Sequence, residues 1–234
     1  RREDQRFLTG QGRYVDDTAP AGALHAVFLR SSVAHAEVTV NADAARTAPG
    51  VHLVLDAAAL VAAGVTLAMP ANLVENRDGT KAANPRHPLL AEGRVRFVGE
   101  AIAMVVAETA MQARDAAELI EVDYDDLPVK LDIASGGPLL HEAALENRAF
   151  DWGMGNEAAT EAAIAAAAHV VTLSVHDNRL ISNPMEARAV WADIEEDRLH
   201  ICLSGQNVWN TKRNAAEILG MAAEDIRVTI PDVG

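Results

Sequence analysis

The sequence LHICLSGQNVWNTKRNAAEILGMAAEDIRVTIPDVG, positions 199–234, decides the fold expected of this chain. Its first six residues alternate between apolar and polar types, which is the period of a half-buried strand. A helix is expected over residues 207–220 and a second strand over residues 227–230. Gln206 lies between the first strand and the helix, where backbone N–H groups and a side-chain amide can face a ligand. The stretch therefore predicts part of a binding site that continues beyond Gly234.

Strands and helices also alternate in the rest of the chain. Capping chemistry predicts three further helices, which begin after Asp56, after Thr109, and after either Asn156 or Thr160. Residues 101–107 form a nearly unbroken apolar run, as in a central strand buried on both faces. Further strands are expected over residues 24–30, 37–41, 51–55, 120–124, 169–176 and 189–194. The alternation predicts a mixed α/β, or α+β, fold.

Two irregular stretches divide the chain. Residues 69–88 contain three prolines and form a loop of about 20 residues, a length that indicates an insertion with a contact role. Proline and glycine collect over residues 125–138, where the apolar periodicity lapses, so a domain boundary is expected there. The predicted division is an N-terminal extension over 1–17, a first domain over 18–130 and a second domain over 131–234.

Composition narrows the classes of partner. Half of the 234 residues are hydrophobic and 4% are aromatic, so a core built mostly of aliphatic side chains is expected. The net charge of −14 repels phosphate backbones and anionic lipid, which disfavours nucleic acid and membrane surfaces as partners. The single cysteine, Cys202, fits a reducing compartment. No apolar run has the length of a membrane span, and a cytoplasmic location is expected.

Gln206 is the strongest candidate for a binding residue, because an amide both donates and accepts and can recognise an oxo group or a pterin edge. On spacing alone, the favoured alternative is that Gln206 is an ordinary strand-end residue that caps a turn. The second cluster is NPMEAR, residues 183–188, in which Glu186 and Arg188 lie two apart and share a face if a strand begins there. They can bind a polar ligand, although pairing with each other or contact with a neighbouring subunit is favoured on chemistry alone.

Neither a metal site nor a catalytic residue is expected from spacing. The eight histidines show no metal-binding spacing, and the acidic run over residues 121–126 lacks the glycine and terminal glutamate of a calcium loop. Cys202 alternates into a strand and is expected to be a small buried side chain. Gly10 and Gly12 follow no strand and lack a third glycine, which argues against a dinucleotide-binding loop.

A series of short motifs in order along the whole chain resembles the large, molybdenum-binding subunit of bacterial xanthine dehydrogenase and aldehyde oxidase-type hydroxylases. The resemblance is closest to the aerobic carbon monoxide dehydrogenase-like branch. The motifs are RFLTG (6–10) with GRYVDD (12–17), RSSVAHA (30–36), PGV (49–51), FVGE (97–100), VDYDDLP (122–128), NPME (183–186) and PDVG (231–234).

The resemblance implies an α/β hammerhead domain over about residues 18–128, followed by the start of the first molybdopterin-binding domain. It implies that Gln206 contacts the molybdenum centre and that the loop reached at Gly234 surrounds the molybdopterin-type cofactor. The implied reaction is hydroxylation of a carbon centre with oxygen from water, or oxidation of carbon monoxide. Electrons would leave through iron–sulfur clusters on a small subunit and FAD on a medium subunit. The glutamate that serves the family as catalytic base lies downstream and has no counterpart in these residues.

The chain alone is therefore expected to be inactive, since one amide contact contributes about 1 kcal/mol and cannot retain a large cofactor. The leading interpretation is the N-terminal part of the catalytic subunit, either excised or left by proteolysis. One alternative is a separately encoded structural subunit that docks on a cofactor-carrying chain. Another is a degenerate homologue that binds a ligand without redox chemistry. No choice of substrate among carbon monoxide, aldehydes and N-heterocycles is made.

A second domain that ends after a few strands should leave apolar side chains without cover. Five such residues are expected to be exposed: Leu199, Ile201, Leu203, Val228 and Ile230. Homodimerisation, pairing with another chain, or poor order beyond about residue 150 is the expected consequence.

Overall fold

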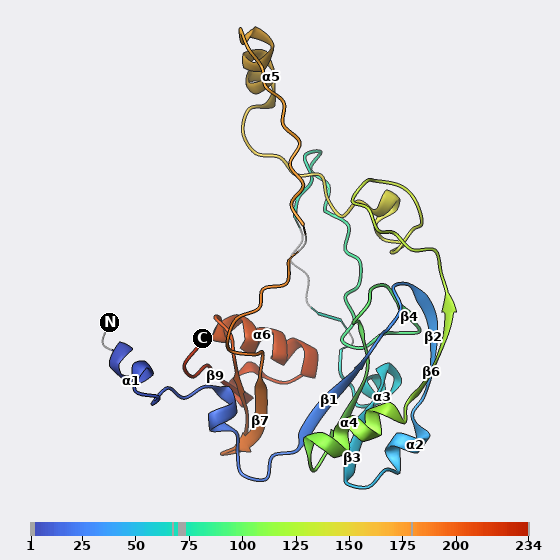
Figure 1. Cartoon of the computed structure of the whole chain (residues 1–234), viewed down its shortest axis with the longest axis vertical. Helices are drawn as coiled ribbons and strands as arrows, with labels where there is room; N and C mark the ends of the chain where they lie inside the picture. The colour runs from blue at the N-terminus through green and yellow to red at the C-terminus, as the bar shows by residue number, and fades with distance from the viewer. Residues whose placement is uncertain (1–2, 67, 70–73, 179, 234) are drawn as a thin grey trace.

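The computed structural model describes residues 3–66, 68–69, 74–178 and 180–233, and it confirms the mixed α/β, or α+β, fold. Two compact units and one long arm make up the molecule (Figure 1). The first unit contains two three-stranded sheets, and the second contains one. The arm carries α5 (Glu157–Ala166) at its far end, away from both units.

The first unit is built from antiparallel strands. One sheet has the order β1-β5-β3, with β1 (His25–Arg30), β5 (Ala101–Ala107) and β3 (Val51–Leu55). The other has the order β4-β2-β6, with β4 (Arg94–Val95), β2 (Ala36–Asn41) and β6 (Glu121–Asp126). Three helices contact the first sheet: α2 (Asp43–Arg46), α3 (Ala57–Ala62) and α4 (Ala110–Glu118).

Strand β5 is buried on both faces, as its apolar run predicts. Ala103 and Val105 pack in a cluster with residues of α4, whereas Ile102 packs in a second cluster with Ala36 and Val95 of the other sheet. All five side chains are almost fully inaccessible to solvent. The alternating side chains of one strand therefore serve two cores, and this arrangement joins the two sheets into one unit.

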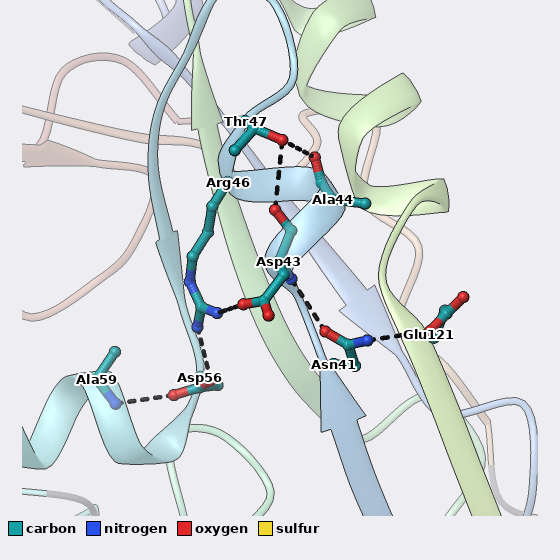
Figure 2. Close-up of polar contacts among 8 residues, drawn as sticks. All are labelled: Asn41, Asp43, Ala44, Arg46, Thr47, Asp56, Ala59 and Glu121. Carbon is teal, nitrogen blue, oxygen red and sulfur yellow. Dashed lines mark hydrogen bonds and ion pairs between the residues drawn. The ribbon is translucent and has the colours of Figure 1, made fainter.

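Helix starts follow the predicted capping chemistry. The Asp56 carboxylate accepts the Ala59 N–H at 2.8 Å, and Arg46 joins Asp56 to Asp43 by ion pairs of 3.2 and 2.9 Å (Figure 2). Thr109 caps α4 in the same way. Of the two residues predicted as the possible cap of α5, Asn156 and Thr160, the structure shows Asn156, because its side chain accepts the Ala159 N–H. These contacts satisfy N–H groups that have no partner inside the helix.

The loop over residues 69–88 contacts the base of the arm, as expected of an insertion with a contact role. Arg77 donates to the Asp151 carboxylate at 2.9 Å and to the Glu157 carboxylate at 3.2 Å. The Ala83 N–H donates to the Ala149 carbonyl at 2.8 Å. Residues 70–73 of this loop lie outside the described part. The contacts fix the start of the arm against the first unit.

The second unit contains a β-α-β element. The sheet has the order β7-β8-β9, with β7 (Val190–Glu195), β8 (Arg198–Leu203) and β9 (Ile226–Thr229). Strands β7 and β8 are antiparallel, whereas β8 and β9 are parallel and are connected through α6 (Val208–Leu219). Two short elements of the N-terminal segment precede the first unit: α1 (Asp4–Leu8) and η1 (Val15–Thr18).

Two segments pack against this sheet. Helix α6 contacts β9. On the face that carries Trp191 and Cys202, the Trp191 Nε1–H donates to the Thr18 hydroxyl at 3.1 Å, and that hydroxyl lies 3.8 Å from the Cys202 sulfur. Cys202 is buried, as predicted. The N-terminal segment thus packs on the sheet of the second unit.

Two expectations about exposure and pairing are wrong. The five apolar residues expected to be exposed, Leu199, Ile201, Leu203, Val228 and Ile230, are half-buried. They lie on the central strand β8, or on or directly after β9, which α6 contacts. Exposed apolar side chains instead lie on the uncovered edge strand, where Val190 and Ile194 are each 66% exposed. Residues 169–176, expected to be a strand, have no sheet partner in the described part of the chain and run as an extended segment of the arm.

Among the helices that the structure describes, none has both the length and the apolar character needed to cross a membrane.

Candidate functional site

Gln206 lies in the short turn between β8 and α6. The Asn207 side chain caps α6 by accepting the Asn210 N–H at 2.9 Å, so the helix begins directly after Gln206. The Gln206 side chain is exposed, and it makes no hydrogen bond with any residue that the structure describes. Its amide is therefore available to a ligand at the N-terminus of a 12-residue helix, where the helix dipole favours negative charge.

Three segments meet at this edge of the sheet. The parallel pairing of β8 with β9 brings residues 230–233 alongside the end of β8. The antiparallel pairing of β7 places Ala189 beside Ser204, with the Ser204 N–H donating to the Ala189 carbonyl at 3.0 Å. Ligands of α/β sheets bind at the carboxyl ends of parallel strands. The edge formed by residues 187–189, 204–207 and 230–233 is therefore the candidate site, and we call it the cofactor edge.

An ion pair joins the N-terminal segment to the cofactor edge. Arg6 donates to both oxygens of the Asp232 carboxylate, and the bond from Nη2 is 2.7 Å long. The Arg13 N–H donates to the same carboxylate at 2.7 Å, while the Asp232 N–H donates to the Arg13 carbonyl at 3.1 Å. The hydrogen bonds from Arg6, followed by the bond from Arg13, lower the pKa of Asp232 to about 2. Residues 231–233 are thereby fixed by a bidentate pair, the strong form of such contacts.

A cavity of about 470 Å³ lies between the N-terminal segment and the residues that lead into β7. Its lining residues are Tyr14, Asp16, Asp17, Met185, Glu186, Ala187 and Ala189. The second predicted cluster therefore contributes Glu186 to a cavity wall, whereas Arg188 is exposed outside it. Gln206 does not line this cavity, so the structure does not bring the two predicted clusters into one pocket.

Two family models match the chain one after the other. The aldehyde oxidase and xanthine dehydrogenase a/b hammerhead domain matches residues 9–128. The molybdopterin cofactor-binding domain matches residues 140–234, which contain the cofactor edge. The chain belongs to the aldehyde oxidase and xanthine dehydrogenase family. The expected hammerhead fold and the start of a molybdopterin-binding domain are confirmed.

Relatives of this hammerhead-domain family align over the whole chain. The nicotine 6-hydroxylase large subunit of Paenarthrobacter nicotinovorans is 36% identical, with 100% of this chain and 29% of the relative covered. The carbon monoxide dehydrogenase large chain of Hydrogenophaga pseudoflava is 29% identical, with 100% and 30% covered.

Solved structures give the same result. Quinoline 2-oxidoreductase from Pseudomonas putida 86 is similar with a TM-score of 0.80 and 35% identity, over 100% of this chain and 30% of that one. A Cu,Mo-containing CO dehydrogenase is similar with a TM-score of 0.83 and 31% identity, over 99% and 30%. The chain thus spans about 30% of the length of the relatives that it matches.

The spacing of histidine, cysteine and acidic residues in the sequence predicts no metal site. Among the described residues, no group of three or more such side chains is placed to hold a metal ion. The acidic residues of the 121–126 run point outward from β6 into solvent, as a solvated strand end should. Gly234, the second expected cofactor-binding residue, lies outside the described residues, and its role stays a prediction.

Sequence reasoning missed a buried polar network on the face of the sheet that carries Cys202. His200 is only 5% exposed, with Nε2 at 2.7 Å from the Thr229 hydroxyl and Nδ1 at 2.9 Å from the Glu195 carboxylate. Arg227 donates to the other Glu195 oxygen at 2.8 Å. The hydrogen bond with His200 is the main reason that the pKa of Glu195 is lowered. This network stabilises the sheet on the side where the strands carry polar residues.

Proposed function

We propose that the chain is the N-terminal portion of the molybdenum-binding catalytic subunit of a xanthine dehydrogenase or aerobic carbon monoxide dehydrogenase-like oxidoreductase. One observation carries the proposal. Within the matched molybdopterin-binding domain, the Gln206 amide lies at the N-terminus of α6, at the edge where β8 and β9 both end. This amide makes no hydrogen bond with any described residue. We use "full-length large subunit" below for a polypeptide of the relatives' length that contains these 234 residues.

The donor set at the cofactor edge fits a molybdopterin-type cofactor. A neutral amide can donate to an oxo group or accept from a pterin N–H, and the helix N-terminus favours an anionic group. Gln206 would hold the cofactor, and Gly234 would contribute from the adjoining loop. When bound, the cofactor supplies the redox chemistry that adds water-derived oxygen to a carbon centre, or oxidises carbon monoxide. Gln206 orients it, and the Arg6–Asp232 pair holds the neighbouring segment in place.

These residues alone do not make a catalyst. Gln206 is one exposed contact, and no residue of the described part is assigned as a general base. A single hydrogen bond contributes about 1 kcal/mol, far less than retention of a cofactor requires. We therefore infer that the 234-residue chain is inactive in isolation, and that the remainder of the large subunit supplies the rest of the pocket and the base.

Partner subunits follow from the same proposal. The relatives are named as a large subunit, a large chain and a complex subunit, which supports a multi-subunit assembly. We propose that a small iron–sulfur subunit and a medium FAD-binding subunit carry the electrons away. The single, buried cysteine supports a reducing compartment, and we propose the cytoplasm.

We also propose the division of the chain into residues 1–17, 18–130 and 131–234. The family matches over 9–128 and 140–234 support a boundary in the linker between them. The extension over residues 1–17 contacts the second unit through Arg6 and Arg13, which donate to the Asp232 carboxylate. Thr18, the first residue of the proposed hammerhead domain, contacts Trp191 and Cys202 of the same unit.

The proposal is tested by molybdenum and pterin analysis of the purified full-length large subunit, alone and with its partner subunits. Turnover is assayed with nicotine, quinoline and carbon monoxide, the compounds in the names of the relatives. We expect about one molybdenum per large subunit and turnover of at least one member of this panel or of a related N-heterocycle or aldehyde. A full-length subunit that carries neither molybdenum nor pterin would refute the proposal and would favour a docking role without cofactor.

A further inference from the structure

The extended segment over residues 169–176, which we call the arm strand, has no sheet partner among the residues that the structure describes. Its apolar side chains are almost completely solvated, with Val171 91%, Leu173 80% and Val175 76% exposed. Within the part of the chain that the structure describes, none of its backbone N–H or C=O groups makes a hydrogen bond. Folded proteins rarely leave so much extended, apolar backbone without a neighbour.

The sequence of the arm strand is that of a sheet strand with one buried face. Val171, Leu173 and Val175 alternate with Thr172 and Ser174, so the apolar side chains share one face. The residue types are mostly β-branched or otherwise favourable in strands, and neither proline nor glycine interrupts them. Exposed edge strands of natural proteins usually carry lysine or proline that blocks pairing. The arm strand carries neither, which indicates that its edge is normally paired.

The helix at the end of the arm supports this interpretation. Helix α5 has no buried residue, and Ile164 on it is 48% exposed. Its alanine-rich surface and the start of the arm strand line one open groove of about 720 Å³, which includes Ala163 and Val171. A groove of small and apolar side chains can take close-packed neighbouring elements. Figure 1 shows that neither compact unit reaches this part of the arm.

The size of the relatives indicates what covers the arm. The chain accounts for about 30% of their length, so most of the large subunit lies outside these residues. A second copy of this chain is a poorer occupant, because each copy carries a net charge of −14 and the two would repel. Addition of an extended segment to a sheet uses main-chain hydrogen bonds for affinity and alternate side chains for specificity. Both features are present in the arm strand.

We propose that residues 169–176 form a β-strand in a sheet whose other strands belong to the rest of the same large subunit. This inference rests on the proposed function, because it takes the 234 residues to be part of that subunit. The arm is then the element by which the N-terminal portion joins the remainder of the polypeptide. The 234-residue chain and the full-length large subunit differ at this segment, which is paired only in the latter.

Amide hydrogen exchange, followed by mass spectrometry, tests the pairing directly. It is measured on the 234-residue chain at two concentrations and on the full-length large subunit without its partner subunits. We expect amides of residues 170–176 to exchange at the rate of an unstructured peptide in the short chain, and at least about 100-fold more slowly in the full-length subunit, as in native sheets. Rapid exchange in the full-length subunit would overturn the proposal. So would protection in the short chain that rises with concentration, because that result identifies a second copy as the partner.

A pair of substitutions in the full-length subunit adds a second measurement. Leu173→Asp places a charge on the apolar face of the arm strand and should restore exchange at residues 170–176 to within about 10-fold of the peptide rate. Leu8→Asp, at an 87% exposed position of α1, is the matched control and should leave that exchange unchanged. Equal effects of the two would contradict the pairing. Molybdenum content, measured on the same samples, separates the two proposals. Protection of residues 170–176 without bound molybdenum would refute the proposed function and support the proposed strand. Bound molybdenum without protection would support the function and refute the strand.

Discussion

Replacement of Ile226 by alanine should destabilise the second unit much more than the same replacement at Ile194. The register places Ile194, Leu199 and Ile226 in one row across the sheet, on one face. Ile226 is 0% exposed, whereas Ile194 is 66% exposed. Alanine removes three carbon atoms, which is about 2.4 kcal/mol of transfer free energy at a buried site, and the cavity raises the cost to about 3–4 kcal/mol. At Ile194, where only about a third of the side chain is buried, alanine removes about a third of the transfer free energy, which is roughly 0.8 kcal/mol.

The two variants of the 234-residue chain are compared by urea unfolding at pH 7, followed by tryptophan fluorescence. Trp191 is a suitable reporter because it lies in this sheet, with its ring 4.8 Å from the His200 ring. We expect the free energy of unfolding of the second unit to fall by about 2–3 kcal/mol more for Ile226→Ala than for Ile194→Ala. Equal losses would refute the assignment of Ile226 to a covered core and, with it, the packing of α6 on the sheet that carries Gln206.

Three other predictions concern the Arg6–Asp232 ion pair, the cap of α3 and the cofactor. Because the folded-state pKa of Asp232 is about 2 against an ordinary 3.8, the stability from its pairing with Arg6 is complete above about pH 4 and is lost as the pH falls toward 2. Arg6→Ala should therefore reduce the acid dependence of unfolding in that window, and an unchanged acid titration by fluorescence would contradict this. Asp56→Ala should lower the free energy of unfolding in urea by about 0.5–2 kcal/mol, because the α3 cap is lost. Asp43→Ala, which removes only an exposed ion pair with Arg46, should lower it by under about 0.5 kcal/mol. Equal losses for the two variants would contradict the cap. The isolated 234-residue chain should carry no stoichiometric molybdenum by elemental analysis, and one metal per chain would show that the rest of the pocket is not required.

Local chemistry was readable in the sequence. Asp56 and Thr109 cap helices by contacts within three residues, so the residues that decide these caps are close together in the sequence. The position of Gln206 between a strand and a helix follows from the same kind of pattern. The burial of β5 on both faces was visible as an apolar run that lacks alternation. Each of these predictions depends on a few neighbouring residues and not on the rest of the chain.

Long-range contacts were not readable. The Arg6–Asp232 pair joins residues 226 positions apart, and no spacing rule foresees it. His200 lies on the polar face of β8, yet it is buried because Trp191 and the N-terminal segment cover that face. The exposure predicted for Leu199 and its row was wrong for a related reason, since the burial of these side chains depends on the neighbouring strands and on the packing of α6 against β9. The strand predicted over residues 169–176 was wrong for the described part of the chain, because a strand needs sheet neighbours that the described residues do not provide.

The central claim is that the cofactor edge holds the molybdenum cofactor through Gln206. The most direct test is the molybdenum content of the full-length large subunit with Gln206→Ala, compared with Gln5→Ala at an exposed position of α1 and with the unaltered subunit. Circular dichroism establishes that all three are folded alike. The account predicts that Gln206→Ala loses about 10-fold in cofactor affinity, or in turnover per bound metal, while Gln5→Ala behaves as the unaltered subunit. Full molybdenum content and full turnover in Gln206→Ala would contradict it.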